Sequence, residues 1–347
     1  MRYRFICAPV SGNGGTETVV VAVVNHLAEL NKNVDLFLTL EPENRSWLTK
    51  INSNVNIVHF TGHTKIEKLF YLNRIFYSTS NDDRLIILGA NIIKLAYFYR
   101  KILKKKWKIY SWIHYSLYNQ NLFNPKNILY ADIHLAISTS IKKQLIELGE
   151  PEKKIRLIFN PISKYKGEKN IPDNTSVLRV VYVGKIMLTG QKNLIELFNA
   201  VKNYKGKIHI DLFGADTTNG EIFNFLKNED LIKFCTFHKW TDDPWKEIIT
   251  KVHPNCLVLS SKYEGLPMVM LEALSRGIPC IVADFYGSSD IINSQNGVIY
   301  KSRNINDFVN KLEYVNSKYY NSESITRSIN KFYEKEYFER LDKILGI

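Results

Sequence analysis

The stretch SSKYEGLPMVMLEALSRGIPCIVAD, residues 260–284, decides the fold class of this chain. An apolar run at 256–259 ends where the stretch begins, and Pro267 then opens an apolar helical pattern. A second apolar run follows at 279–282. Short apolar runs on either side of a helical pattern are typical of a βαβ unit, so a parallel sheet is predicted here.

The same alternation extends over both halves of the chain. In the first half we predict strands at 3–9, 34–40, 55–60, 84–88, 108–114, 133–137 and 155–159. Apolar residues three and four apart predict helices at 17–30, 66–77, 92–103 and 141–148. After a polar connector at 160–176, a second series of strands is predicted at 178–183, 208–213, 256–259, 279–282 and 298–300.

The predicted fold class is therefore α/β, with two facing Rossmann-like domains. A chain of 347 residues is long enough for two domains. The first domain is expected over 1–165 and the second over 166–323. The helical pattern at about 324–347 could pack back on the first domain.

Composition points to a folded protein in the cytoplasm. The hydrophobic fraction of 45% is ordinary for a globular chain, and the apolar runs are too short to span a membrane. The N-terminus lacks the features of a signal peptide. The four cysteines are scattered without a CxxC pair, so we expect reduced core residues at Cys7, Cys235, Cys256 and Cys280.

The formal charge of +13 is partly concentrated in one short run. Its members are Arg100, Lys101, Lys104, Lys105, Lys106 and Lys108. Such a run can attract anionic lipid headgroups, nucleic acid or a phosphorylated substrate, because all three carry negative charge. It can equally be a solvated helix face, so charge alone does not select a partner.

Two carboxylates flank the predicted start of the helix at Pro267. Glu264 lies on the loop, where it could accept hydrogen bonds from sugar hydroxyls, and Glu272 lies two turns along, where it could reach a ribose diol. The helix start also offers backbone amides and a favourable dipole to a phosphate. The amides in question belong to Gly265, Leu266, Met268 and Val269.

A second candidate segment is YVGKIMLTGQKN, residues 182–193, in which a predicted strand runs into a loop. Lys185 and Lys192 are two cations at a strand end, an arrangement that suits a diphosphate. Two lysines on a loop are also common as solvent-facing residues. The role of these two lysines in binding a diphosphate is therefore not decided by their position alone.

Two further candidates lie in the first half. The segment PVSGNGGTETVV, residues 9–20, joins the first strand to the first helix, and Gly12, Gly14 and Gly15 would permit close backbone approach. Glu17 occupies the place of the third glycine of GxGxxG, which weakens a dehydrogenase interpretation. His114 ends a predicted strand and is either a sugar contact or a core residue.

Glu264 and Glu272, with seven residues between them, resemble the glutamate-pair motif of the family 4 glycosyltransferases of GT-B fold. The segments ADIHLAIS, IFNPI, YVGKIMLTGQKN and DDPW extend the resemblance over nearly the whole chain, and it is strongest toward the lipopolysaccharide 1,6-galactosyltransferases. The resemblance implies an active site in the cleft between an N-terminal acceptor domain and a C-terminal nucleotide-sugar domain. The stretch 31–108 resembles the family least.

The resemblance also implies roles for the candidate residues. Lys185, Lys192, Glu264 and His114 would be catalytic, and the two lysines would stabilise the leaving diphosphate. Lys185 stands where the family commonly has arginine, which keeps the charge but loses the bidentate fork. The donor-binding set would be Gly14, Gly15, Gly265, Leu266, Met268, Val269 and Glu272. Ser138, Asn160 and Trp240 match the family more weakly.

The expected reaction is transfer of a hexose, galactose first, from a UDP-sugar to a bacterial surface glycan, with retention of configuration. No cofactor and no metal are expected, since no Asp-x-Asp triplet exists. The expected partners are the donor, a glycan or lipid-linked acceptor and the anionic inner leaflet, without nucleic acid. Alternatives are transfer from UDP-glucose or UDP-N-acetylglucosamine onto capsule, a sugar-nucleotide epimerase, and a basic membrane-binding or nucleic-acid-binding module.

Overall fold

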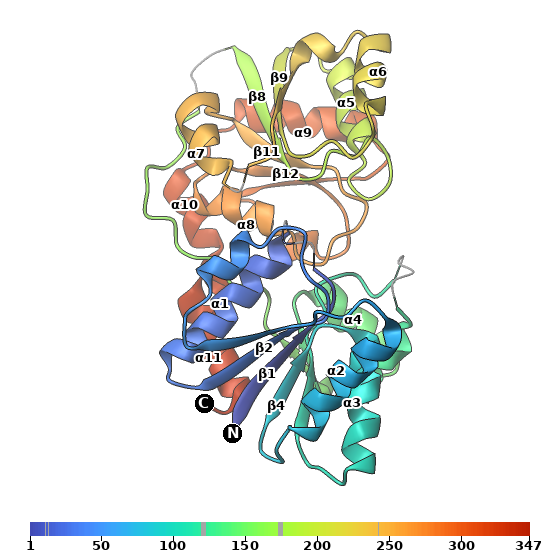
Figure 1. Ribbon diagram of the computed structural model, residues 1–347. Helices are drawn as coiled ribbons and strands as arrows, with labels where there is room; N and C mark the ends of the chain where they lie inside the picture. Colours follow the sequence, from blue (N-terminus) through green and yellow to red (C-terminus); the bar gives the residue numbers. More distant parts are fainter. Residues whose placement is uncertain (11, 13, 119–122, 173–175, 242) are drawn as a thin grey trace. The chain divides into compact units, whose positions relative to one another are not determined.

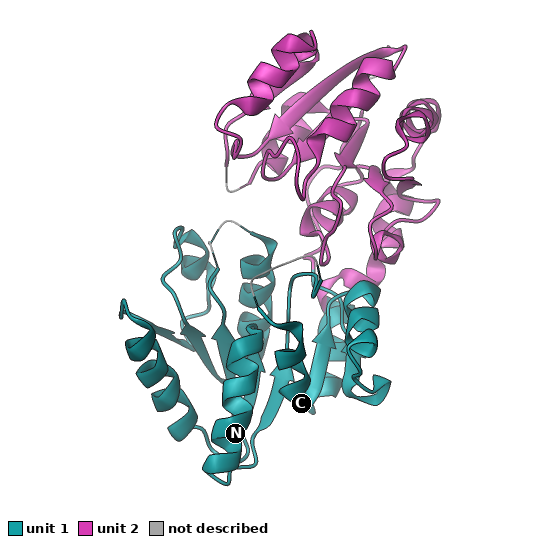
Figure 2. Cartoon of the chain, turned by 90° about the vertical axis from the view of Figure 1, so that its right-hand side faces the viewer, with its two compact units in different colours: residues 1–161, 335–347 teal, residues 162–334 magenta. Residues whose placement is uncertain are grey.

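The computed structural model describes all residues except 11, 13, 119–122, 173–175 and 242. The chain divides into two compact units, shown in different colours in Figure 2. Unit 1 comprises Met1–Pro161 and Lys335–Ile347, and unit 2 comprises Ile162–Glu334. Each unit has its own parallel sheet covered by helices, which confirms the predicted pair of α/β domains.

Unit 1 has a seven-stranded parallel sheet in the order β3-β2-β1-β4-β5-β6-β7. Its strands are β1 (Arg2–Cys7), β2 (Asn33–Leu38), β3 (Val55–His59), β4 (Arg84–Ile87), β5 (Lys108–Ser111), β6 (Ile133–Ala136) and β7 (Ile155–Leu157). Its long helices are α1 (Gly15–Glu29), α2 (Lys65–Tyr77), α3 (Ala90–Ile102), α4 (Thr139–Glu147) and α11 (Glu334–Leu345). Figure 1 shows α1 and α11 on one side of the sheet and α2, α3 and α4 on the other.

Unit 2 repeats the pattern with six parallel strands in the order β10-β9-β8-β11-β12-β13. The strands are β8 (Val177–Val183), β9 (Lys207–Phe213), β10 (Cys235–His238), β11 (Cys256–Leu259), β12 (Cys280–Ala283) and β13 (Gly297–Tyr300). The helices include α5 (Leu194–Asn203), α6 (Glu221–Asn228), α7 (Trp245–Glu247), α8 (Met268–Ser275), α9 (Ile305–Ser317) and α10 (Ser322–Ser328). The predicted strands are all present, whereas β10 is absent from the prediction because this edge strand is only partly buried and its segment CTFH is not a continuous apolar run.

The strand order explains where ligands can bind. In each sheet the order reverses beside the first strand, between β1 and β4 in unit 1 and between β8 and β11 in unit 2. Loops leaving the carboxyl ends of two such strands diverge to opposite faces and leave a crevice. The candidate glycine loop follows β1, and the candidate lysine and glutamate loops follow β8 and β11.

Four predicted strands end two or three residues earlier than expected. The predicted strands 3–9, 34–40, 108–114 and 155–159 are β1, β2, β5 and β7, which end at Cys7, Leu38, Ser111 and Leu157. Apolar character persists beyond the sheet because the loops at its carboxyl edge are themselves buried, as Trp112 and Ile113 are. His114 therefore lies three residues beyond β5 and not within a strand.

The C-terminal region is not the single helix that the sequence pattern suggested. It comprises α10, a short 3₁₀ turn at Asn330–Phe332 and α11. Helix α10 belongs to unit 2, and most of α11 belongs to unit 1, where Phe338 stacks on His26 of α1 with ring centroids 3.9 Å apart. The units divide at 161/162 and 334/335, compared with the expected 165/166 and about 324, since Ile162 pairs with Tyr333 inside unit 2.

The four cysteines are free thiols, and Cys7, Cys256 and Cys280 are buried in the sheets while Cys235 is half-buried. Burial raises the pKa of the Cys7 thiol to about 12. No helix in the described part of the chain combines the length and the apolar character needed to cross a bilayer.

Candidate active site

Lys192 and Glu264 meet at the carboxyl edge of the unit 2 sheet. The Nζ atom of Lys192 lies 2.6 Å from Oε1 of Glu264, and Gln191 donates from Nε2 to Oε2 of the same carboxylate over 3.4 Å. The side chains of Lys192 and Glu264 are only 17% and 9% exposed. Two predicted site residues 72 positions apart therefore form a largely buried ion pair beside the reversal point of the sheet.

The backbone around the pair fixes its position. Ser260, directly after β11, donates its hydroxyl to the carbonyl of Lys192 over 2.9 Å. The amide of Lys262 donates to the carbonyl of Gln191, also over 2.9 Å. Asn193 then adopts a left-handed conformation, with φ of 52°, and α5 begins at the next residue. The lysine loop and the glutamate loop are thus held to each other by backbone contacts as well as by the ion pair.

Lys185 lies on the same edge, directly after Gly184 at the end of β8. Its carbonyl accepts the hydroxyl of buried Tyr182 over 2.7 Å, which anchors the backbone, while its side chain is exposed. Within the described residues the ammonium of Lys185 makes no ion pair or hydrogen bond. A Cβ atom at Gly214 would lie 1.8 Å from the carbonyl oxygen of Gly184, so a glycine at 214 is required for this close approach.

Helix α8 begins beside the ion pair with free backbone donors. Pro267 precedes its first residue, and no side chain caps the helix. In the described chain, no hydrogen bond is made by the amides of Gly265, Leu266, Met268 and Val269. Unpaired amides and the positive end of the helix dipole favour an anion at this position. The geometry therefore suits a phosphate next to Lys192.

Glu272 lies further along α8. Its carboxylate is held by Trp245, a residue to which the sequence alone gave no role. The indole Nε1 of Trp245 donates to Oε2 of Glu272 over 3.0 Å, and Trp245 is buried. Burial raises the pKa of the Glu272 carboxyl, and the Trp245 hydrogen bond and the charge of Arg276 partly oppose this shift. The segment DDPW, which carried part of the family resemblance, was the only sequence signal for Trp245.

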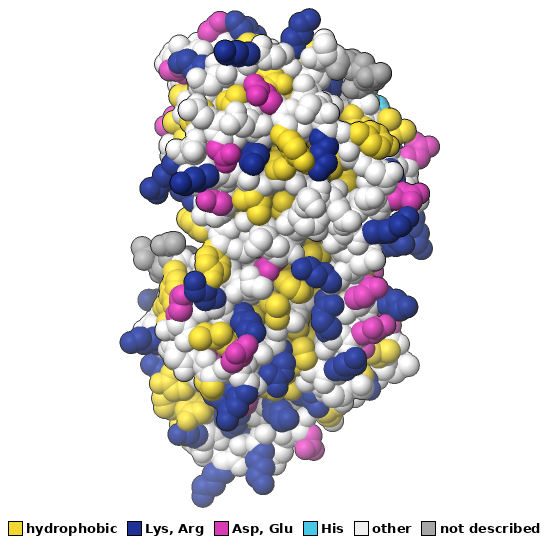
Figure 3. All heavy atoms as spheres, turned by 180° about the vertical axis from the view of Figure 1, so that it is seen from behind, with side chains coloured by type: hydrophobic (Ala, Val, Ile, Leu, Met, Phe, Trp, Pro, Cys, Tyr) yellow, Lys and Arg dark blue, Asp and Glu magenta, His cyan; other side chains and the backbone are white. Residues whose placement is uncertain are grey.

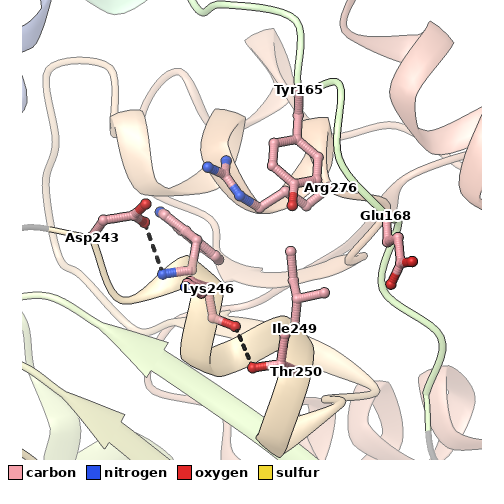
Figure 4. A pocket seen from close by; sticks show the side chains of 8 residues that line it. Tyr165, Glu168, Asp243, Lys246, Ile249, Thr250 and Arg276 are labelled. Carbon is pink, nitrogen blue, oxygen red and sulfur yellow. Dashed lines mark hydrogen bonds between the residues drawn. The ribbon is translucent and has the colours of Figure 1, made fainter.

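Trp245 also lines a pocket of about 200 Å³ in unit 2. Figure 4 shows Tyr165 lying against Arg276 on one side of this pocket and Asp243 and Lys246 on another. The guanidinium of Arg276 lies 4.5 Å from the centroid of the Tyr165 ring and 5.0 Å from that of Trp245. Arg276 thus packs between two aromatic rings, and Nη1 donates to the carbonyl of Glu272 over 2.9 Å.

The described glycines of the loop after β1 are Gly12, Gly14 and Gly15. Gly12 has a φ of 87°, and its amide donates to Oε1 of buried Glu17 over 2.6 Å. A Cβ atom at Gly12 would lie 1.9 Å from the carbonyl oxygen of Asn44. Gly14 precedes α1 and Gly15 is its first residue, while positions 11 and 13 of the same loop lie outside the described residues. The local backbone structure therefore explains why position 12 is a glycine.

His114 lies in unit 1, beside Trp112, with the two ring centroids 4.6 Å apart. Burial lowers its pKa to about 3, so the imidazole is neutral near neutral pH. Its Nε2 atom is buried and has no hydrogen-bond partner among the described residues. A neutral ring with an unused nitrogen can donate to or accept from a hydroxyl group.

The three weaker candidates differ in their surroundings. Ser138 caps α4 by accepting a hydrogen bond from the amide of Ile141 over 3.2 Å, which accounts for it structurally. Asn160 is buried, and its Oδ1 has no partner in the described chain. Trp240 is 45% exposed. No group of three or more His, Cys, Asp or Glu side chains suited to a metal ion occurs in the described ranges.

Two parallel-sheet α/β units, with paired glutamates and lysines at the sheet edge of the second, define a glycosyltransferase of GT-B fold. Residues 163–332 match the family described as "Glycosyl transferases group 1". The chain is 31% identical to the lipopolysaccharide 1,6-galactosyltransferase of Escherichia coli strain K12, over 99% of this chain and 98% of that protein. The chain therefore belongs to the group 1 glycosyltransferases.

Solved structures agree with this assignment. The apo form of the lipopolysaccharide outer core galactosyltransferase WaaB superposes with a TM-score of 0.87 at 28% identity, covering 100% of this chain and 99% of that one. HepE from Anabaena, solved in complex with UDP, gives a TM-score of 0.81 at 14% identity with complete coverage of both chains. The similarity to HepE shows that the two proteins share the same fold.

Proposed function

We propose that this glycosyltransferase transfers a hexose, with galactose favoured, from a UDP-sugar to a hydroxyl of a bacterial surface glycan such as lipopolysaccharide core. The Lys192–Glu264 pair beside the free amides of α8, with Glu272 on the same helix, is the observation that carries the proposal. The end-to-end similarity to a lipopolysaccharide 1,6-galactosyltransferase supports galactose and this acceptor class. UDP-glucose or UDP-N-acetylglucosamine, with capsule as acceptor, is the alternative.

The donor would be held by groups with complementary chemistry. The diphosphate would lie between the amides of α8 and the ammonium groups of Lys185 and Lys192, and the ribose diol would bind Glu272. When the diphosphate binds, Lys192 would move from Glu264 toward the phosphates. Glu264 would then accept hydrogen bonds from the sugar hydroxyls. This arrangement places positive charge where negative charge develops as the nucleotide leaves, which is where electrostatic stabilisation is most effective.

The proposed reaction proceeds with retention of configuration. The bond between the anomeric carbon and the diphosphate oxygen breaks, and the acceptor oxygen attacks from the same face. The acceptor proton passes to the departing diphosphate, so no side-chain nucleophile is needed. Neutral His114 would contact the transferred sugar, which is the role that the family resemblance implies for it.

A panel of nucleotide sugars tests the donor assignment. Thermal shift and slow hydrolysis are measured with UDP-galactose, UDP-glucose, UDP-N-acetylglucosamine, GDP-mannose and NAD, because a ligand that binds the folded state raises its melting temperature. We expect one UDP-sugar to stabilise the protein and to release UDP, and Glu272→Ala to weaken both effects. If no nucleotide sugar raises the melting temperature or is hydrolysed, the proposed donor site is refuted.

The same assay tests the metal-independent mechanism. Lys185 and Lys192 supply the positive charge that a divalent cation supplies in other transferases, so we expect turnover to be unchanged by EDTA or by added Mg²⁺. Strict loss of turnover in EDTA, restored by Mg²⁺, would contradict this mechanism while leaving the donor assignment intact.

A further inference from the structure

Gln191 is the second hydrogen-bond partner of the Glu264 carboxylate and has no part in the proposed donor site. Its Nε2 atom donates to Oε2 of Glu264 over 3.4 Å and to the backbone carbonyl of Tyr263 over 3.1 Å. Both groups only accept hydrogen bonds, so they determine which end of the Gln191 amide faces them. Lys192 lies on Oε1 of the same carboxylate. Within the described residues, these two adjacent side chains are the donors that reach Glu264, and each takes one oxygen.

The Gln191 amide joins the side chain of Glu264 to the carbonyl directly before it. A single donor shared by a carboxylate and its own neighbouring backbone restricts the direction in which the carboxylate points. The two loops are also joined by backbone carbonyls, since the amide of Lys262 donates to Gln191 and the hydroxyl of Ser260 donates to Lys192, each over 2.9 Å. These two contacts do not use the Gln191 side chain. Its specific contribution is therefore the orientation of the carboxylate.

The Lys192–Glu264 pair differs from the many charges on the protein surface. On the face drawn in Figure 3, Lys and Arg side chains are spread over both units and project into the solvent. Salt screens such exposed charges. The side chains of Lys192 and Glu264 are only 17% and 9% exposed. A carboxylate as buried as Glu264 needs a hydrogen-bond donor of the protein whenever the ammonium of Lys192 leaves it.

The proposed function requires Lys192 at two places in turn. Lys192 pairs with Glu264 in the structure, and it would move toward the diphosphate when the donor binds. The ammonium group carries a full charge and is attracted by the phosphates, whereas the amide of Gln191 carries none and is attracted far less. Gln191 would therefore remain on Oε2, and the departing ammonium would free Oε1 for a sugar hydroxyl.

We propose that Gln191 is a positioning residue, which holds the Glu264 carboxylate toward the transferred sugar while Lys192 is engaged with the diphosphate. The inference rests on the proposed function and adds to it a residue that does not contact the reacting atoms. A carboxylate that keeps one donor on Oε2 still has lone pairs on Oε1 for the sugar. Without Gln191, the carboxylate would lose its remaining partner in the protein at the moment when its direction matters.

The variant Gln191→Met tests the proposal, because it keeps the length of the side chain and removes its donor. UDP has no sugar to reach Glu264, so its affinity, measured by titration, should change by less than about twofold. The kcat for hydrolysis of the UDP-sugar that the unmodified chain accepts should fall by on the order of tenfold, the effect of one hydrogen bond to a charged group. A comparable loss of UDP affinity would mean that the lysine loop itself has moved, and would overturn the proposal.

A double variant shows whether Gln191 acts through Glu264. In the Glu264→Ala background no carboxylate remains to be oriented, so Gln191→Met should cause no further loss of kcat. Single-turnover hydrolysis with excess enzyme keeps the weak activity of this background measurable. A further loss as large as that in the chain that retains Glu264 would show that Gln191 acts elsewhere.

Gln295 offers a matched control, because it is an exposed glutamine of the same unit. Gln295→Met should equal the unmodified chain in kcat, UDP affinity and melting temperature. If the melting temperature shows that Gln191→Met does not fold, Gln191→Asn replaces it, since the shorter amide cannot reach both acceptors and the same loss of kcat is expected.

The unmodified chain separates the two levels of the proposal. If it neither binds UDP nor hydrolyses any UDP-sugar, the proposed function is refuted, and this inference with it. If the unmodified chain is active and Gln191→Met is equally active, the donor site stands and only the role of Gln191 is refuted.

Discussion

The two lysines of the candidate site differ in how much of their role is structural. Lys192 is largely buried against Glu264, whereas the ammonium of exposed Lys185 makes no ion pair or hydrogen bond with the described residues. A lysine that neutralises a buried carboxylate contributes to stability, and an exposed lysine does so only slightly. Both charges are nevertheless expected to act on the donor diphosphate.

Glutamine substitutions separate these contributions. Lys192→Gln leaves Glu264 without its cation, so we expect the free energy of unfolding to fall by about 1 to 3 kcal/mol. Lys185→Gln should change it by no more than about 0.5 kcal/mol. Turnover should fall in both variants, by on the order of tenfold or more. Urea unfolding and donor hydrolysis measure the two quantities, and equal stability of the two variants would contradict a structural role for the buried pair.

Trp245 is a positioning residue for Glu272 and has no expected contact with the reacting atoms. Its indole N–H donates to the carboxylate that would bind ribose. In Trp245→Phe the ring remains and this donor is lost, so we expect KM for the donor to rise by about tenfold, the size of one hydrogen bond to a charged group, with little change in kcat. Trp47→Phe is the control, since Trp47 is also buried but its Nε1 has no partner among the described residues. A fall in kcat with unchanged KM would argue against this role.

At the scale of elements, the site depends on two strand-to-loop junctions that touch. Gly184 follows β8 and Gly214 follows β9, and the amide of Gly184 donates to the carbonyl of Phe213 over 2.9 Å. The carbonyl of Gly184 lies so close to position 214 that no side chain fits there. The orientation of the loop that carries Lys185 is therefore set by a residue on a neighbouring strand.

Two glycine substitutions test this junction. Gly214→Ala would place Cβ 1.8 Å from backbone oxygen, so the Lys185 loop must move, and we expect donor binding to weaken by at least about tenfold together with a loss of stability of several kcal/mol. Gly220→Ala is the control, because Gly220 also has a positive φ, of 87°, but open space around its Cβ position. Its cost should be only about 1 kcal/mol of backbone strain, without effect on the donor. Thermal denaturation and donor titration distinguish the two results.

At the scale of the whole molecule, buried histidines link the stability of unit 1 to pH. His134 of β6 is buried, with Nδ1 2.7 Å from the hydroxyl of Ser111, and burial lowers its pKa to about 4 against the opposing charge of Glu150. His114 is shifted in the same direction. Between pH about 4 and about 6.5 these two histidines bind more protons in the unfolded chain than in the folded chain, so their contribution lowers stability as pH falls through this interval.

A pH series measures this linkage. Each histidine should remove up to about 1.4 kcal/mol of stability per pH unit below its unfolded pKa. His134→Gln should therefore flatten the decline in melting temperature between about pH 7 and about pH 5, whatever its effect at pH 7. His63→Gln, at an exposed position, should leave the slope unchanged. An identical slope in the His134 variant would mean that other groups carry the acid sensitivity.

The sequence by itself determined the order of the elements and the chemistry of the candidate residues. Strands of a parallel sheet are buried on both faces, so β11 and β12 appear as the continuous apolar runs CLVL and CIVA. The roles of Glu264, Glu272, Lys185 and Lys192 remain predictions from the motif, but the contact between Lys192 and Glu264 is consistent with β8 and β11 being neighbours in the sheet.

Only the tertiary structure decided which surfaces and partners these residues have. Trp245 and Glu272 are 27 residues apart, and nothing in the local pattern pairs them. The segment KIEKLFYLNRIFY of α2 is apolar on more than one face, so periodicity alone cannot say that Ile66 and Phe70 point outward. Likewise, the C-terminal pattern looked continuous, yet α10 and α11 pack in different units. Local sequence sets conformational preferences, whereas burial is decided by contacts between residues that are distant in the chain.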